Sequence, residues 1–339
     1  MNGLQISEQF FQEYGLPAFQ AAVPEMMPEL TFGLAGQGSE CFGFDDEVSR
    51  DHDWGAGFCV WVPSERFQEW APKLQRIYDG LPSTYAGFPV KGRAVSGEQR
   101  IGVQDGDMFF YQFTGNKGVP AEPFAWFRTG EEAYAVATNG KLFFAGGEPV
   151  GDAAAPGAAA SEAAASFWTG GAAASSAKTK FARDYLELKK GYPEDIRVKK
   201  IAARAVKMAQ SGQYNYVRCM GRGNRVAAFQ AMAEFVKETC SMVHLLNHAY
   251  CPFYKWMWRS LKEQPILGET IATALQFLVE EPYAESAKDT IEQICITVKL
   301  ELQRQGLTDI DEDFLEPHGA RIMANITDPQ VARLPVSYG

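Results

Sequence analysis

Four residues near the start of the chain have the types and spacing that phosphate and metal chemistry needs. Gly38 and Ser39 form a Gly-Ser pair, and Asp51 and Asp53 follow with one residue between them. A glycine turn lets main-chain N–H groups approach a phosphate, and a serine hydroxyl adds a neutral donor. Asp51 and Asp53 would point to the same side of an extended strand, because side chains there repeat every two residues. Two carboxylates on one side could hold Mg²⁺ against a triphosphate, so this layout favours nucleotidyl transfer.

The segments on either side of these residues predict the elements that must position them. Residues 30–35 and 58–62 are apolar runs typical of strands, and the Gly-Ser pair follows the first of them. Residues 6–27 have apolar side chains near helical spacing and predict a helix. Ser64 is the predicted N-cap of a further helix that ends at about Tyr78.

The next part of the chain continues this alternation of strands and helices. Residues 100–103 predict a third strand, and the Asp105-Gly106 turn precedes a short predicted helix over residues 108–110. Asn139-Gly140 is a turn signal, and it predicts a hairpin between residues 134–136 and 142–144. The alternation indicates an α/β first domain.

The second half of the chain has the pattern of a helical bundle. A helix is predicted to begin at Pro193, and a long one to begin after Asn224 and end at Pro252. Further helices are predicted near residues 256–263, 266–279, 283–305 (ended by Gly306) and 312–325. The predicted division is an α/β domain at 1–150, an Ala/Gly/Ser-rich linker or insertion at 151–178, and a helical domain at 179–339.

Composition narrows the classes of protein to consider. The six cysteines are scattered without a Cys-x-x-Cys pair, which favours reduced thiols in a cytoplasm over a disulfide framework or a zinc site. Neither a signal peptide nor a membrane span is expected. The net charge of −10 argues against a protein that coats nucleic acid. Residues 178–225 nevertheless carry thirteen lysines and arginines against four acids, either as a phosphate-receiving surface or as a basic helical face docked against an acidic domain.

Taken together, Gly38-Ser39 and Asp51-His52-Asp53 resemble the pattern of the DNA polymerase β-like nucleotidyltransferase superfamily. The longer stretch 38–53, with Tyr250-Cys251-Pro252-Phe253-Tyr254-Lys255-Trp256, is similar to a bacterial family of uncharacterised nucleotidyltransferase-like proteins, over nearly the whole chain. The resemblance implies an α+β protein. An N-terminal nucleotidyltransferase domain with a mixed sheet would be followed by a C-terminal α-helical bundle.

The resemblance also implies roles for individual residues. Gly38 and Ser39 would hold the β- and γ-phosphates of a nucleoside triphosphate, with ATP as the expected donor. Asp51 and Asp53 would be the catalytic metal ligands, binding Mg²⁺ or Mn²⁺. The helical domain would bind the acceptor and the base, as in aminoglycoside nucleotidyltransferases.

One residue of the superfamily pattern has no counterpart in the sequence. A later strand there supplies a third carboxylate, and the position that aligns with it is Gly102. Glu98, Asp105 and Asp107 lie nearby, but none is at the required position. Because of this departure, a protein that binds a nucleotide without transferring part of it remains an alternative.

Two cations are further candidates for nucleotide binding. Arg50 either contacts phosphate or forms an ion pair with Asp45 or Asp46. Lys255 lies among aromatic residues, where it could reach a triphosphate or activate an acceptor hydroxyl, or else belong to an aromatic packing edge. Two interpretations remain for Arg218, Arg222 and Arg225: they contact phosphate, or they are charges exposed to solvent in a loop. His244 and His248 are expected to be core or interface residues.

The resulting functional hypothesis is a metal-dependent nucleotidyltransferase that moves a nucleoside monophosphate, with AMP from ATP expected, to a hydroxyl of an unknown acceptor and releases pyrophosphate. The first alternative is a catalytically silent nucleotide-binding or interaction protein. The second is a transferase acting on RNA, in which Lys199 and Arg204 would contribute to RNA binding.

Overall fold

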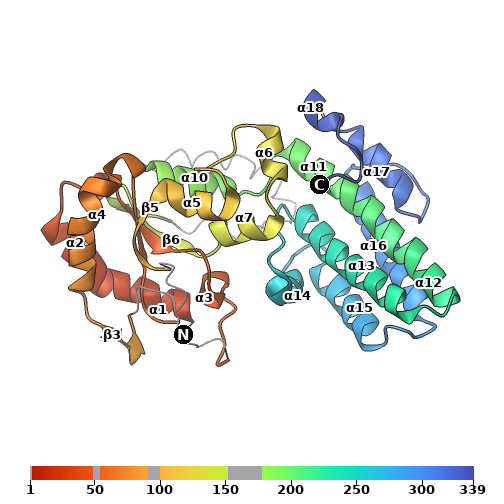
Figure 1. Cartoon of the computed structure of the whole chain (residues 1–339), viewed down its shortest axis with the longest axis horizontal. Coiled ribbons are helices and arrows are strands. Elements are labelled where there is room, and N and C mark those ends of the chain that lie inside the picture. Colours follow the sequence, from red (N-terminus) through yellow and green to blue (C-terminus); the bar gives the residue numbers. More distant parts are fainter. Residues whose placement is uncertain (1, 49–53, 91–99, 152–177) are drawn as a thin grey trace. The chain divides into compact units, whose positions relative to one another are not determined.

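The structure is a computed structural model that describes residues 2–48, 54–90, 100–151 and 178–339 (Figure 1). It confirms the α+β class, with a five-stranded mixed sheet and a helical C-terminal region. Contacts divide the chain into two compact units. Among the described residues, the first unit contains those up to 121, 133–151 and 178–190, and the second contains 122–132 and 191–339. Each unit is described by itself below.

The sheet of the first unit has the strand order β5-β2-β1-β6-β7. Its strands are β1 (Thr31–Leu34), β2 (Cys59–Val62), β5 (Gly102–Asp105), β6 (Lys141–Ala145) and β7 (Glu148–Pro149). β2 and β5 are parallel, and the other neighbours are antiparallel. Gly33 pairs with Cys59, and Cys59 pairs with Gly102. The C-terminal end of β1 and the N-terminal ends of β2 and β5 therefore meet at one end of the sheet, called here the turn end.

Helices cover both faces of the sheet. On one face, the predicted N-terminal helix consists of α1 (Gly3–Phe10), a π-helical turn η1 (Phe11–Gly15) and α2 (Leu16–Ala22). It ends at Ala22 rather than residue 27, and a short 3₁₀ turn, η2 (Met27–Glu29), follows. The ring of Phe11 packs 5.1 Å from that of Phe32 in β1. These contacts explain why an aromatic-rich N-terminal segment precedes the first strand.

The opposite face carries α5 (Gly106–Thr114) and α10 (Lys180–Leu188). Trp61 of β2 stacks on Phe181 of α10, with ring centroids 4.3 Å apart and planes inclined by 14°. Thr31 and Thr179 share a 2.6 Å hydrogen bond between their hydroxyls. Because both faces are covered, every residue of β1 and β2 is buried.

Two local predictions in this unit are wrong. The helix predicted from Ser64 is α4 (Ser64–Asp79), but Pro63 occupies its N-cap position and the Ser64 hydroxyl donates to the Asp105 carboxylate instead. The hairpin around Asn139-Gly140 is a helix-to-strand turn, because residues 134–136 belong to α7 (Glu131–Thr138). β6 instead forms its hairpin with β7. A separate two-stranded sheet contains β3 (Thr84–Tyr85) and β4 (Phe88–Pro89).

The second unit is helical, as predicted, and α11 (Glu194–Met208) lies at its centre, with twelve buried residues. The other elements are α6 (Pro123–Phe127), the π-helical η3 (Ala209–Tyr216), α12 (Val217–Gly221), α13 (Arg225–Leu246), α14 (Tyr254–Lys262), α15 (Gly268–Glu280), α16 (Ala287–Arg304), α17 (Glu316–Met323) and α18 (Pro329–Ala332) (Figure 1). The Asn224 side chain caps α13 as predicted, accepting from Ala227 N at 3.1 Å. α13 ends at Leu246 and not at Pro252, since His248 takes a left-handed conformation with φ of 56°.

The basic side chains of α11 are packed inside this unit. The Lys199 ammonium donates to the carbonyl of Val336 at 3.1 Å, and Arg204 pairs with Glu131 at 2.6 Å and Glu238 at 3.2 Å. The Lys200 ammonium lies 4.8 Å from the centre of the Tyr192 ring. Burial lowers the pKa of both Lys199 and Lys200 to about 8. Lys199 and Arg204 are therefore buried. They are the two side chains to which the RNA-directed hypothesis assigns RNA binding.

All six cysteines are free thiols, and only Cys219, in α12, is not buried. Burial raises the pKa of Cys59 and Cys240 to about 12. Of the helices within the described residues, none combines the length and apolar character that crossing a bilayer requires.

The first testable feature is the hydroxyl of Tyr78, which is buried against the chain just before β2. It donates to the carbonyl of Phe58 at 2.9 Å and accepts from the Phe58 N–H at 3.0 Å. Tyr78→Phe leaves that buried N–H without its acceptor, so we expect the free energy of unfolding to fall by about 1–3 kcal/mol in urea titrations. The matched control is Tyr111→Phe, at a side chain that is 48% exposed, which should change stability by less than about 0.5 kcal/mol. Equal effects of the two substitutions would contradict the assignment.

Candidate functional site

The chain leaves β1 at Leu34 and turns through Gly38 into the short helix α3 (Ser39–Phe42). Gly38 has φ of 136° and ψ of 145°, a combination that is essentially restricted to glycine. A Cβ at this position would also overlap the Arg100 guanidinium and the Glu40 carboxylate. Only glycine therefore fits the turn, because the side chains of Arg100 and Glu40 occupy the space beside its Cα.

An ion pair lies directly against this turn. Arg100, just before β5, donates to the Gln37 carbonyl from Nε at 3.0 Å and from Nη2 at 2.6 Å. Its Nη2 also lies 2.5 Å from Glu40 Oε1. Burial raises the pKa of Glu40, and the nearby guanidinium of Arg100 only partly offsets this rise. Residues far apart in sequence thus fix both the start and the first helical turn of the Gly38-Ser39 segment.

The opposite side of the turn is held by Asn139. Its Oδ1 accepts from Gly36 N and its Nδ2 donates to Gly36 O, both at 2.8 Å. The hydroxyl of Tyr185, from α10, donates to the Asn139 carbonyl at 2.5 Å. The Asn139-Gly140 signal therefore marks a clamp on the chain before Gly38, a role that the hairpin interpretation missed.

Lys189 lies at the end of α10 beside the same clamp. Its ammonium donates to the carbonyl of Gly140 at 2.8 Å and to the Tyr185 hydroxyl at 3.2 Å. Within the part of the chain that the structure describes, it pairs with no carboxylate, and burial lowers its pKa to about 8. Lys189 could not be singled out from its sequence, because its neighbour Lys190 has the same charge and lies on the surface.

Several predicted site residues cannot be placed. Arg50, Asp51, His52 and Asp53 lie outside the described residues, so their assigned roles in metal and nucleotide binding stay predictions. Asp45 is described, and its Oδ2 accepts from Gly3 N at 2.8 Å and from the Trp54 indole at 3.2 Å. Asp45 therefore orients the loop after α3 by tying it to the N-terminus of α1.

The carboxylates considered for the third ligand lie away from the turn end. Asp105 is the last residue of β5, three positions beyond Gly102, and about 10 Å along the strand at 3.3 Å per residue. Its side chain caps α5 by accepting from Met108 N at 3.1 Å, and Asp107 pairs with Lys180 at 2.8 Å. Glu98 lies outside the described residues. Within the described ranges, no three His, Cys, Asp or Glu side chains gather as a metal site would need.

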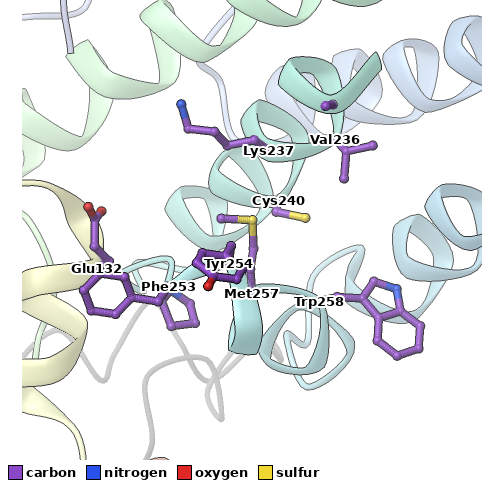
Figure 2. Close-up of a pocket in the computed structure, with 10 residues that line it drawn as sticks. Glu132, Val236, Lys237, Cys240, Phe253, Tyr254, Met257 and Trp258 are labelled. Carbon is purple, nitrogen blue, oxygen red and sulfur yellow. The ribbon is translucent and has the colours of Figure 1, made fainter. Parts of the chain in front are cut away.

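Lys255 belongs to the second unit, in the first turn of α14. Its side chain is exposed, and its ammonium lies 5.5 Å from the centre of the Trp256 ring. A pocket of about 440 Å³ lies beside it between α13 and α14, but Lys255 does not line this pocket. Figure 2 shows Tyr254 and Met257 in its middle, with Glu132 and Phe253 at one end and Trp258 at the other.

His244 is a core residue, as expected, whereas His248 is half-buried. His244 is fully buried; its Nδ1 lies 2.7 Å from the Cys240 carbonyl, and its Nε2 lies 2.9 Å from the Ser260 hydroxyl. Arg218 and Arg225 lie over the rings of Tyr214 and Tyr283, at 4.9 Å and 5.2 Å. The contacts of these two arginines are therefore to aromatic rings of the same unit.

Comparison with known families gives one match. Residues 159–257 match the family described as a domain of unknown function, DUF4037. The matched segment includes α11, α13 and the Tyr250–Trp256 stretch, so a similarity to uncharacterised proteins is confirmed over that part of the chain. A search of curated proteins and a search of solved structures each gave no significant match.

A pair of glycine substitutions tests the geometry of the turn. Gly38→Ala combines a forbidden backbone conformation with the overlap against Arg100 and Glu40. Gly43 also has a positive φ, 71°, but nothing lies within 4 Å of its missing Cβ. We expect Gly43→Ala to cost about 1–2 kcal/mol of unfolding free energy and Gly38→Ala at least about 1 kcal/mol more. Denaturant titration of both variants makes the comparison, and a Gly38→Ala cost no larger than that of Gly43→Ala would refute the packing described.

The pKa of Lys189 leads to a prediction about pH. Its folded-state value of about 8 lies below the ordinary 10.5, so the unfolded chain holds the proton more tightly. The stability cost of burying this ammonium is therefore fully present below pH 8 and disappears as pH rises to 10.5. Lys189→Met should stabilise the protein by about 1–2 kcal/mol at pH 7, with a smaller gain at pH 10. Lys190→Met is the control, and it should show no such pH dependence in parallel denaturation series.

Proposed function

We propose that this protein is a metal-dependent nucleotidyltransferase with a polymerase β-like catalytic domain. It would move a nucleoside monophosphate from a triphosphate, with ATP as the expected donor, to a hydroxyl of an acceptor. The observation that carries the proposal is the Gly38-Ser39 turn at the turn end of the sheet, between β1 and α3. A mixed arrangement with β2 antiparallel to β1 and parallel to β5 accompanies it, in keeping with the resemblance of the sequence.

The turn has the properties of a phosphate cradle. Gly38 carries no side chain, the first N–H groups of α3 have no side-chain cap, and the Ser39 hydroxyl binds no partner among the described residues. Main-chain N–H groups and a hydroxyl together are suited to phosphate oxygens. Since α3 has only four residues, these donors and not a helix dipole would account for binding.

Lys189 would add a positive charge to the same region. Its buried ammonium has only neutral acceptors, Gly140 O and the Tyr185 hydroxyl, among the described residues. A bound phosphate would supply the missing counter-charge and raise the pKa of Lys189 again. Arg50 is kept as a proposed phosphate contact of this turn, and Lys255 as a proposed phosphate contact within the second unit.

The reaction would replace one phosphorus–oxygen bond with another. The acceptor hydroxyl oxygen would bond to the α-phosphorus while the bond from that phosphorus to the bridging oxygen breaks, releasing pyrophosphate, and the hydroxyl proton would pass to solvent water. Mg²⁺ or Mn²⁺, held by Asp51 and Asp53, would neutralise charge on the phosphates. The turn, Ser39 and Lys189 would hold the triphosphate in position, which accounts for much of the catalysis in phosphoryl transfer.

A second candidate function is nucleotide binding without transfer. It is favoured by the places of Asp105 and Asp107, which lie beyond the far end of β5 and are engaged by α5 and Lys180. Without the third carboxylate of the superfamily pattern, the acceptor hydroxyl would lack the protein base that takes its proton. In that case the turn would bind a triphosphate and leave it intact.

The decisive experiment measures pyrophosphate release from ATP with Mg²⁺ or Mn²⁺ across a panel of hydroxyl acceptors. Asp51→Ala combined with Asp53→Ala should lower release at least 100-fold, because it removes the proposed metal ligands. Ser39→Ala should lower release roughly 10-fold, because it removes a proposed phosphate donor. Ser286→Ala, at an exposed serine of the second unit, is the matched control and should have no effect.

Calorimetric titration with ATP separates the two candidates. Binding that needs Ser39 and Lys189, without release on any acceptor, would favour the silent protein. Binding and release that are unchanged in the Asp51→Ala plus Asp53→Ala protein would rule out both.

A further inference from the structure

The pocket between α13 and α14 is lined by aromatic side chains that are exposed to solvent. Its lining includes three aromatic side chains that remain open to solvent, with exposed fractions of 44% for Phe253, 86% for Tyr254 and 43% for Trp258. Met257 and Val236 complete an apolar floor. Aromatic rings clustered around a concave surface favour a flat, apolar ligand that covers them. A volume of about 440 Å³ is within the range of small-molecule sites.

Two charged groups add hydrogen-bonding capacity at the margin of this pocket. Glu132 lines it and forms no hydrogen bond or ion pair with any described residue. Lys237 lies 3.5 Å from Glu234 and 3.4 Å from Glu238, so its charge is already offset. Glu132 can accept from a ring amine, and Lys237 can donate to a ring nitrogen or carbonyl. A heteroaromatic ring with both donors and acceptors satisfies the two groups, whereas a hydrocarbon would leave Glu132 unpaired.

The helix that forms one wall is basic in an acidic protein. α14 contains Lys255, Arg259 and Lys262 and no acidic residue, while the whole chain has a net charge of −10. The Lys262 ammonium lies 4.5 Å from the centre of the Trp258 ring. Neither Lys255 nor Lys262 forms an ion pair within the described ranges. Uncompensated cations next to stacking rings form a combination that binds nucleotides through base and phosphate together.

We propose that this pocket binds a nucleotide, with its base against Tyr254 and Trp258 and its phosphate near Lys255 and Lys262. Every residue of this proposed site belongs to the second unit. It rests on the proposed function only in naming the bound nucleotide as the acceptor. A free mononucleotide and one nucleotide of a single-stranded RNA offer the same chemistry, and the test below distinguishes them.

The test uses the full chain with EDTA and without triphosphate. Fluorescence anisotropy follows a labelled single-stranded hexaadenylate RNA, and unlabelled AMP serves as competitor. Tyr254→Ala and Trp258→Ala should each weaken binding roughly tenfold, because each removes a stacking surface. Lys255→Ala and Lys262→Ala should reduce the dependence of affinity on salt. Ser39→Ala should leave binding unchanged, because the triphosphate site takes no part.

Matched controls come from the same unit. Phe277, in α15, is 40% exposed but does not line the pocket, so Phe277→Ala should have no effect. Lys288 is an exposed lysine of α16, and Lys288→Ala controls for loss of charge. Thermal melts identify any variant that fails to fold, and the Tyr254→Phe variant should then retain binding, because it keeps the ring.

The outcomes separate this inference from the proposed function. Competition by AMP at the affinity of the hexamer supports a free nucleotide, and binding of the hexamer alone supports RNA. Equal binding by wild type, Tyr254→Ala and Trp258→Ala would overturn the inference, as would binding of neither probe, or binding to anionic phosphatidylglycerol vesicles instead. Pyrophosphate release that persists in such a case would leave the proposed function intact. Binding that depends on the pocket residues, without any pyrophosphate release, would support the pocket as a nucleotide site and contradict the proposed transferase function.

Discussion

The turn after β1 is held by hydrogen bonds and an ion pair from Asn139 and Arg100, two residues that are distant from it in sequence. Asn139 binds both polar main-chain groups of Gly36, and Arg100 binds the carbonyl of Gln37 together with the carboxylate of Glu40. Between these contacts the chain at Gly38 has no room for a side chain. These contacts determine where α3 begins and where Ser39 lies. A turn of this kind is specified by few local residues, but its contacts require the strands of the sheet to pair in the correct register.

The regular elements were predictable because their signals are local. Continuous apolar runs predicted β1 and β2, and the Asn224 cap and Gly306 marked helix ends that the structure confirms. The errors arose where one residue has two uses. Asn139 has the type of a hairpin turn but serves as a clamp, and Ser64 has the type of an N-cap but donates to Asp105. Local patterns cannot distinguish these uses, since the choice depends on partners about 40 and 100 residues away in the chain.

The candidate site was predictable only in part, for the same reason. Gly38 and Ser39 were recognisable from type and spacing. Arg100 and Lys189 were not, because their contacts depend on where β5 begins and α10 ends relative to the turn. The basic run at 178–225 shows the converse problem. From the sequence, this charge could belong to a phosphate-receiving surface or to a helical face docked against an acidic domain. In the structure, α11 directs Lys199, Lys200 and Arg204 toward carbonyls, rings and carboxylates within its own unit.

The distribution of thiols has a practical consequence. Five of the six cysteines are buried, and those with pKa values of about 12 would hold very little thiolate near neutral pH. Cys219 alone is partly open to solvent. A maleimide dye added to the native protein would therefore label α12 without any cysteine having to be removed by mutation. The chain thus carries a built-in attachment point for a spectroscopic reporter on its helical unit.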